Sequence, residues 1–388
     1  MTVVITGASG HVGGVLTRTL IKQRRHVRVL VHKDTRALDD LRVQRVEADI
    51  LKPDTLAKAF QGAGTVYHLA AHISIEGGKD RITRMINVEG TSNVVDACIE
   101  ANVEKLVHFS SIHALNACPK DQEIDETREY VDTGDCYMYD RTKAEAERIV
   151  LMGVKRGLFA VIVNPTGIIG PLDFKPSHMG QVLVTMYQGK LPALMEGGFN
   201  WVDVRDVVTG AMAAEQRGRR GQSYLLSGHW MALKDLARLI HEVTGVKQPT
   251  FVSPYWLARL GAPFAASYNR LRGKPASYTS ASISYLQDYR YISCEKAQTE
   301  LGYRPRSMRE TIEDTYKWFK QAGRLEKFTR EELQRLQDRQ TRLKSRLQQK
   351  PKPKQDDELE FVPKQKTRPK LKDARMPRPR KIPFDELK

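Results

Sequence analysis

Short apolar runs alternate along the chain with longer stretches in which apolar residues recur every three or four positions. The runs predict buried strands and the stretches predict amphipathic helices. Six strands are expected, at residues 3–6, 27–32, 43–48, 65–69, 106–109 and 159–163. Helices are expected between them, at about 13–23, 53–60, 81–101 and 139–154. This alternation is typical of an α/β fold with a parallel sheet covered by helices.

The first strand runs into a glycine-rich turn, Gly7-Ala8-Ser9-Gly10-His11-Val12-Gly13. Gly7 permits a tight exit from the strand, Gly10 lets backbone N–H groups approach a pyrophosphate, and Gly13 lets the next helix pack closely on the sheet. The G-x-x-G-x-x-G spacing is a weak signal alone, but a strand before it and a helix after it strengthen it. We therefore expect a dinucleotide at this turn.

The carboxyl ends of the other predicted strands indicate where the rest of this ligand would lie. Ligands of open α/β sheets bind at the carboxyl ends of the strands. Six residues at these ends are expected to converge on one crevice: Gly7, His32, Asp49, Ala70, Ser111 and Pro165.

Tyr139 and Lys143 lie four residues apart in a predicted helix, which places the phenol and the ammonium on one face. The nearby positive charge is expected to lower the pKa of Tyr139 and make it a general acid or base near neutral pH. Tyr316 and Lys320 repeat this spacing in a late amphipathic helix. Because Tyr139 follows the Ser111 strand end and Tyr316 lies beyond the nucleotide lobe, we assign catalysis to Tyr139.

Over residues 1–320 the sequence resembles the extended short-chain dehydrogenases/reductases, in the branch of NAD-dependent epimerases/dehydratases and dihydroflavonol-reductase-like proteins. The matching motifs, in order and spacing, are TGASGHVG at 6–13, ADI at 48–50, YHLAA at 67–71, NVEGT at 87–91, FSSI at 109–112, YDRTK at 139–143, NPTGIIGP at 164–171 and WVDVRDV at 201–207. The fold implied is a Rossmann-type, doubly wound parallel sheet with a smaller C-terminal substrate lobe.

The resemblance implies hydride transfer to or from a carbonyl or alcohol carbon by a Ser-Tyr-Lys triad of Ser111, Tyr139 and Lys143. Tyr139 would move the proton of the substrate oxygen, Ser111 would hydrogen-bond that oxygen, and Lys143 would tune Tyr139 and hold the nicotinamide ribose. The turn and the resemblance together imply further cofactor contacts at Gly7, Ser9, Gly10, His11, Val12, Gly13, Asp49, Ile50, Leu69, Ala70, Ala71, Pro165, Gly167 and Ile168.

The end of the second strand predicts the choice of cofactor. An acidic residue there would accept a hydrogen bond from the ribose 2′-OH of NAD. The chain instead places His32, Lys33 and Arg36 at this point, which favours the 2′-phosphate of NADP. Asp34 keeps NAD as the alternative.

The substrate is expected to be a small molecule with a carbonyl or alcohol group. The segment 197–201, Gly-Gly-Phe-Asn-Trp, lacks the arginine that relatives acting on nucleotide sugars usually carry there. This favours an uncharged or apolar substrate and a reductase; a nucleotide-sugar epimerase or dehydratase with retained NAD is the alternative. Expected wall residues are His72, His113, Met138, Met179 and Tyr187.

Composition divides the chain. From 321 to 388 there are 21 Lys and Arg against 11 Asp and Glu, a net charge of +10 out of +17 for the whole chain, and seven prolines fall in the last 38 residues. Such a segment buries too little apolar surface to order itself. The expected parts are a Rossmann domain at 1–171 joined by 201–217, a substrate lobe at 172–200 and 218–320, a helical extension at 321–350, and a disordered basic tail at 351–388.

The remaining expectations concern partners and compartment. Cys98, Cys118, Cys136 and Cys294 show no metal-ligand spacing, which predicts free thiols in a reducing cytoplasm and no metal. No apolar run reaches the ~20 residues of a transmembrane helix. The family resemblance allows a homodimer built on two long helices. The basic tail is most simply solvated, with nucleic acid, another acidic partner or an anionic membrane surface as the alternatives.

Overall fold

The computed structural model describes residues 1–31, 35–73, 80–131, 136–191, 193–257 and 280–325. Residues 1–326 form one compact unit, and 327–388 form a second that lies outside the described residues. The predicted helical extension and basic tail therefore lie outside them almost entirely.

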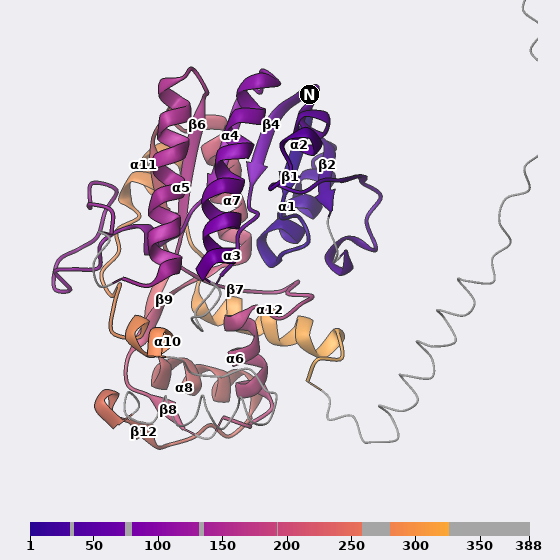
Figure 1. The fold of residues 1–388 in the computed structure, drawn as a ribbon. Helices are drawn as coiled ribbons and strands as arrows, with labels where there is room; N and C mark the ends of the chain where they lie inside the picture. Colours follow the sequence, from indigo (N-terminus) through magenta and orange to yellow (C-terminus); the bar gives the residue numbers. More distant parts are fainter. Residues whose placement is uncertain (32–34, 74–79, 132–135, 192, 258–279, 326–388) are drawn as a thin grey trace, which may run out of the picture. The chain divides into compact units, whose positions relative to one another are not determined.

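Seven parallel strands form the main sheet, in the order β10-β6-β5-β4-β1-β2-β3 (Figure 1). Their bounds are β1 Thr2–Thr6, β2 His26–Val31, β3 Gln44–Glu47, β4 Ala63–His68, β5 Lys105–Phe109, β6 Ala160–Pro165 and β10 Ser223–Leu226. The six predicted strands are confirmed. The edge strand β10 was not predicted; it pairs with β6 after the chain returns from the lobe.

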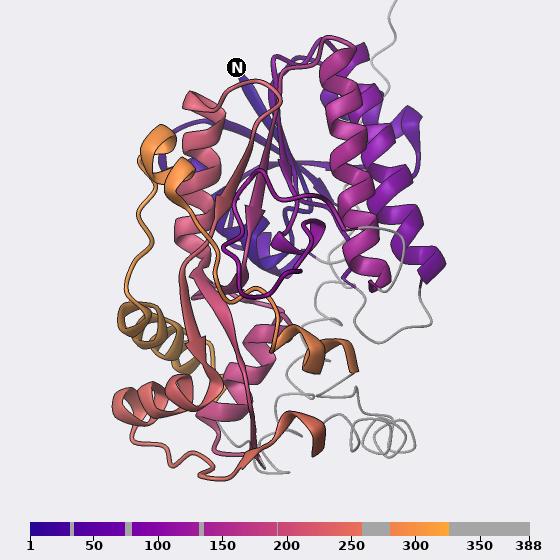
Figure 2. The same ribbon diagram turned by 90° about the vertical axis from the view of Figure 1, so that its left-hand side faces the viewer.

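Helices cover both faces of this sheet, as Figure 2 shows from the side. One face packs against α1 (His11–Lys22), α7 (Val204–Arg217) and α11 (Glu295–Leu301). The other packs against α2 (Pro53–Phe60), α4 (Gly90–Glu100) and α5 (Met138–Lys155). In β1 the fully buried side chains of Val3, Val4 and Ile5 alternate between the two cores, which explains why the strand reads as a continuous apolar run.

The predicted long helix at 81–101 is interrupted. It consists of α3 (Asp80–Arg84), a π-helical turn η2 (Met85–Glu89) and α4. Asn87 lies in this turn; its side chain accepts from the backbone N–H of His72 at 2.7 Å and donates to Thr142 Oγ1 at 3.1 Å. The turn thus joins the end of β4 to α5, and Asn87 is a structural hydrogen-bonding residue.

The C-terminal lobe is built on a three-stranded sheet, β11-β9-β7, and a two-stranded one, β12-β8. Their bounds are β7 Gly167–Ile169, β8 Leu194–Met195, β9 Gly198–Asp203, β11 His229–Ala232 and β12 Val252–Ser253. The lobe's helices are α6 His178–Tyr187, α8 Leu233–Thr244, α10 Ser280–Tyr285 and α12 Met308–Gln321. The fully buried Trp201 on β9 lies in a core shared by α6, α8 and α12.

Ion pairs to the buried carboxylates of Asp203 and Asp206 fasten the chain where it returns from the lobe. Asp203 caps α7 and pairs with Arg205 at 2.7 Å, and Arg205 also reaches Asp314 of α12. Arg306 contacts Asp206 through its backbone N–H and its guanidinium. Removing one partner of such a pair leaves an uncompensated buried charge. These residues are structural.

The end of the compact unit suggests a test by truncation. Arg324 donates to Phe174 O at 2.8 Å and accepts from Gln188 at 3.2 Å, while Leu325 packs on the lobe core. A chain ending at Glu326 should therefore melt like the full-length protein. A chain ending at Gly323 should melt about 1.5 °C lower, because it loses contacts worth about 1 kcal/mol. Calorimetry checks this, and equal melting of the two truncated chains would contradict it.

Candidate active site

A cavity of about 390 Å³ lies at the carboxyl edge of the main sheet, between the sheet and the lobe; we call it the edge cavity. It brings together the ends of β1, β4, β5 and β6, as the parallel topology requires. The predicted site residues that line it are Gly7, Gly10, His11, Val12, Gly13, Leu69, Ala71, Ser111, Tyr139, Lys143, Pro165, Gly167 and Ile168.

The glycine turn forms one end of this cavity. Gly7 has φ +71°, and a Cβ on it would lie 2.7 Å from Ala70 N; a Cβ on Gly13 would lie 2.3 Å from Gly7 O. A Cβ on Gly10 would meet only Gly7 O, at 3.3 Å, and would otherwise fill the open cradle. Helix α1 begins here with no capping side chain and no acidic residue in its first turn. Its unpaired N–H groups and dipole suit a pyrophosphate.

Tyr139 and Ser111 meet inside the cavity. The Tyr139 phenol is buried and hydrogen-bonded to the Ser111 side chain, and the Ser111 hydroxyl also accepts from the His113 backbone N–H at 3.3 Å. Burial raises the pKa of Tyr139 to about 12, although the bond to Ser111 opposes the rise. The expectation of a lowered pKa was therefore wrong for this structure, because desolvation of the phenolate dominates.

Lys143 lies one turn further along α5. Its Nζ donates to Phe109 O at 2.9 Å, at the end of β5. Burial lowers the pKa of this ammonium to about 8, and the nearby Glu147 opposes the shift. In this arrangement the ammonium is directed at the strand end rather than at the phenol of Tyr139.

A polar network beneath α5 holds the strand ends. The buried Glu147 accepts from Asn164 Nδ2 at 2.6 Å. The same Asn164 nitrogen donates to Ser111 O at 3.1 Å. Burial raises the pKa of Glu147, with the hydrogen bond from Asn164 and the charge of Lys143 opposing. Side chains of α5, β5 and β6 are thus locked together directly behind Tyr139 and Lys143.

Several predicted cofactor residues do not line the edge cavity. Ser9 and Ala70 flank it in the two turns, whereas Asp49 accepts from Leu51 N at 3.0 Å and Ile50 packs in the core with α2 and α4. Arg36 is exposed in a 3₁₀ turn, η1 (Arg36–Leu38). His32 and Lys33 lie outside the described residues.

Two of the five residues expected to line the substrate site do so. His113 and Met179 line the edge cavity, whereas His72 and Met138 do not. Tyr187 was wrongly expected there: its ring packs against Tyr316 at 5.3 Å in the lobe core. The same contact gives Tyr316 a packing role, although it shares the Tyr-x-x-x-Lys spacing of Tyr139.

The lobe contributes walls that the sequence did not reveal. They are Ser177, His178, Phe199, Asn200, Tyr285, Asp288, Tyr289 and Ile292. The residues from 285 onward are more than 140 positions from Tyr139 and carry no motif, so only the fold could place them here.

A family model for the NAD dependent epimerase/dehydratase family matches residues 3–227, more than half of the chain. The chain belongs to this family. This places the chain among the extended short-chain dehydrogenases/reductases.

Proteins with similar sequences match more than 80% of this chain. Over 330 residues it is 32% identical to sterol demethylase protein B of Methylococcus capsulatus, a match covering 83% of this chain and 99% of that protein. Over 325 residues it is 30% identical to a putative dihydroflavonol 4-reductase of Synechocystis sp., covering 82% and 94%. The crystal structure of gox2253 superimposes with a TM-score of 0.74 and 33% identity, covering 84% and 99%.

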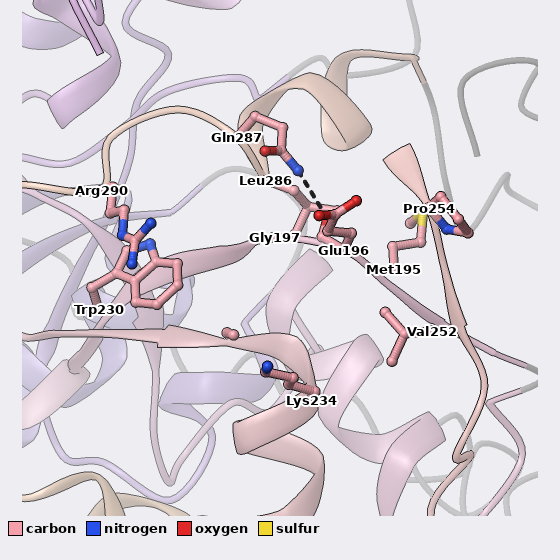
Figure 3. Close-up of a pocket in the computed structure, with 11 residues that line it drawn as sticks. Met195, Glu196, Gly197, Trp230, Lys234, Val252, Pro254, Leu286, Gln287 and Arg290 are labelled. Atoms are coloured by element: carbon pink, nitrogen blue, oxygen red, sulfur yellow. Dashed lines mark hydrogen bonds between the residues drawn. The ribbon is translucent and has the colours of Figure 1, made fainter. Parts of the chain in front are cut away.

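A second cavity of about 660 Å³ lies within the lobe of this epimerase/dehydratase family member (Figure 3). It gathers Glu196, Lys234 and Arg290, and the Arg290 guanidinium lies 4.4 Å from the Trp230 ring centroid. The segment 285–290 separates the two cavities. Residues 285, 288 and 289 face the edge cavity, and residues 286, 287 and 290 face the second one.

Among the residues that the structure describes, no helix is long and apolar enough to cross a membrane, and no cluster of His, Cys, Asp or Glu is arranged to hold a metal ion.

Asp140, beside Tyr139, provides a pH test of the site. Burial raises its pKa to about 7, although Tyr285 donates to its carboxyl at 2.7 Å. The folded state therefore favours the protonated carboxyl, and the associated stability is lost as pH rises from about 4 through 7. Asp140→Asn stays neutral, so it should gain stability relative to wild type over this interval, by at most about 4 kcal/mol. Denaturant titrations at pH 4.5 and 8 measure this.

The exposed Asp121→Asn is the matched control and should follow the wild-type pH dependence. A stability difference between Asp140→Asn and wild type that stays constant from pH 4.5 to 8 would contradict the assignment.

Proposed function

We propose that this protein is an NAD(P)-dependent dehydrogenase or reductase that interconverts a ketone and a secondary alcohol on an apolar, ring-containing substrate. The observation that carries the proposal is the convergence of Ser111, Tyr139 and Lys143 with the glycine turn on one cavity. The two halves of the reaction, a nucleotide cradle and a proton-transferring phenol, thereby share one space.

The walls of the edge cavity support an apolar substrate. Apart from the groups already described, they are largely aliphatic and aromatic, with Ile73, Ile112, Met179, Phe199 and Ile292 among them. No arginine is found among the described residues that line this cavity, and a nucleotide-sugar diphosphate would call for one. The names of two relatives, a sterol demethylase protein and a putative dihydroflavonol 4-reductase, agree with a polycyclic substrate.

Each side chain has a definite task in this proposal. A bound nicotinamide would supply or accept the hydride. Because its pKa is about 12, Tyr139 carries its proton at neutral pH and can donate it to a carbonyl oxygen. Ser111 donates a second hydrogen bond to that oxygen and stabilises the developing negative charge. Lys143, with a pKa of about 8, lies behind Tyr139 and would hold the ribose.

Variants of the two helix residues test the mechanism. Tyr139→Phe should lower kcat by about 10²–10⁴-fold with little change in cofactor affinity, because only the proton-donating hydroxyl is lost. Lys143→Met should weaken both cofactor binding and turnover. Tyr316→Phe removes a hydroxyl from the same sequence spacing in α12 and should retain wild-type kcat. A normal kcat for Tyr139→Phe in NAD(P)H-coupled ketone reduction would refute the mechanism.

The nucleotide that copurifies separates this proposal from a sugar epimerase. An epimerase regenerates its cofactor in every cycle and tends to retain NAD, whereas a reductase exchanges it. An absorption spectrum and mass spectrum of the denatured protein distinguish them; stoichiometric NAD together with interconversion of nucleotide sugars would favour the epimerase.

We also propose a preference for NADP(H), mediated by His32, Lys33 and Arg36. The double variant Lys33→Ala/Arg36→Ala should weaken NADP(H) at least about tenfold more than NAD(H), because charge-assisted bonds to a 2′-phosphate are lost. The double variant Lys22→Ala/Lys58→Ala, at exposed positions of α1 and α2, is the charge-matched control. Cofactor titrations by fluorescence measure both, and equal losses for the two cofactors would contradict the preference.

A further inference from the structure

His113 and Asp140 form a pair at the wall of the edge cavity. His113 lies in a 3₁₀ turn, η3 (Ile112–Ala114), directly after the Ser111 strand end, and its Nδ1 is 3.4 Å from Asp140 Oδ1. That nitrogen is buried and makes no hydrogen bond among the described residues. The same carboxyl oxygen accepts from Tyr285 OH at 2.7 Å. Burying a ring nitrogen without a hydrogen-bond partner costs free energy, so its presence here calls for an explanation.

Aromatic rings fix the orientation of this imidazole. Its centroid lies 4.2 Å from the ring of Tyr285, 4.9 Å from that of Tyr289 and 5.8 Å from that of Tyr139. Tyr289 is itself held, since its hydroxyl donates to Leu115 O at 3.1 Å. The ring therefore has little freedom to turn away from Asp140.

The remaining ring nitrogen is open to the cavity. The His113 side chain is 19% exposed and lines the edge cavity, and Nε2, unlike Nδ1, is not enclosed by protein. Burial lowers the pKa of His113 to about 4, so the ring is neutral at pH 7. With the proton on Nδ1, facing the carboxyl oxygen of Asp140, Nε2 presents a lone pair to the cavity.

We propose that His113, oriented by Asp140 and Tyr285, binds a hydroxyl group of the substrate by accepting its hydrogen bond at Nε2. This rests on the proposed function, because it places that hydroxyl near the carbon reduced beside Tyr139. The ring centroids of His113 and Tyr139 lie 5.8 Å apart, so one small ring system can reach both residues. The substrate class is thus a cyclic hydroxy ketone, or the corresponding diol in the reverse direction.

The pair also predicts what the site rejects. A ketone without the hydroxyl leaves Nε2 unpaired, which penalises binding. A neighbouring carboxylate would meet the lone pair of Nε2 and the acidic side chain of Asp288, which lines the same cavity and is paired with Lys120 at 2.7 Å. At this position of the substrate, a hydroxyl group should bind better than a hydrogen atom, and a hydrogen atom better than a carboxylate.

Three bicyclic probes test this order: 2-hydroxy-1-tetralone, 1-tetralone and freshly prepared 1-tetralone-2-carboxylate. We expect the wild-type kcat/KM ratio of the hydroxylated to the plain ketone to be about tenfold. His113→Phe should bring the ratio close to one, mainly through KM. His113→Gln retains an acceptor of similar reach and should restore part of it. His178→Phe, a histidine of the same cavity with no carboxylate partner among the described residues, should keep the wild-type ratio.

A second measurement does not depend on turnover. In protein labelled with ¹⁵N-histidine, the His113 resonances should show a neutral ring protonated on Nδ1 at pH 7. Asp140→Leu, which removes the carboxylate, should shift the proton toward Nε2. Calorimetric titration of 2-hydroxy-1-tetralone and 1-tetralone into the cofactor complex should show tighter binding of the former, and His113→Phe should abolish the difference.

The outcomes separate the two proposals. If wild type reduces both tetralones with a ratio near one, or if Nε2 carries the proton, the role of His113 is overturned and the reductase stands. If no ketone is reduced while the tautomer and the binding preference are as expected, the reductase fails and the role of His113 stands.

Discussion

The site depends on the hydrogen-bond network around the buried carboxyl of Glu147. This carboxyl lies under α5, where burial disfavours its charge, and it is retained because Asn164 donates to it and Lys143 lies one turn away. Asn164 in turn donates to the backbone at Ser111. Strands β5 and β6 and helix α5 are therefore held at fixed positions by one connected network, and the triad residues project from those three elements.

Burial then decides the chemistry of the residues in front of this network. It raises the pKa of Tyr139 to about 12 and that of Asp140 to about 7, and it lowers the pKa of Lys143 to about 8 and that of His113 to about 4. At neutral pH the phenol of Tyr139 and the imidazole of His113 are therefore both uncharged. A site of neutral hydrogen-bonding groups in an apolar cavity suits a ketone better than a charged sugar nucleotide.

The parallel core was predictable from the sequence because its signals are local. Strands buried on both faces read as unbroken apolar runs, and α2 was predicted at its observed bounds, Pro53–Phe60. The glycine turn was predictable because only glycine fits at Gly7 and Gly13, where a Cβ would collide with backbone. Topology then required Ser111 and the start of α5 to lie at the same edge of the sheet as that turn.

The sequence by itself thus determined the family, the sheet and the nucleotide edge, since these follow from periodicity, steric limits on glycine and motif order. Only the tertiary structure decided the direction of the pKa shift of Tyr139, because desolvation depends on neighbours far away in the chain. It alone brought Tyr285 to Asp140 across 145 positions and directed His113 into the cavity. A contact between segments so far apart leaves no spacing in the sequence by which it could be predicted.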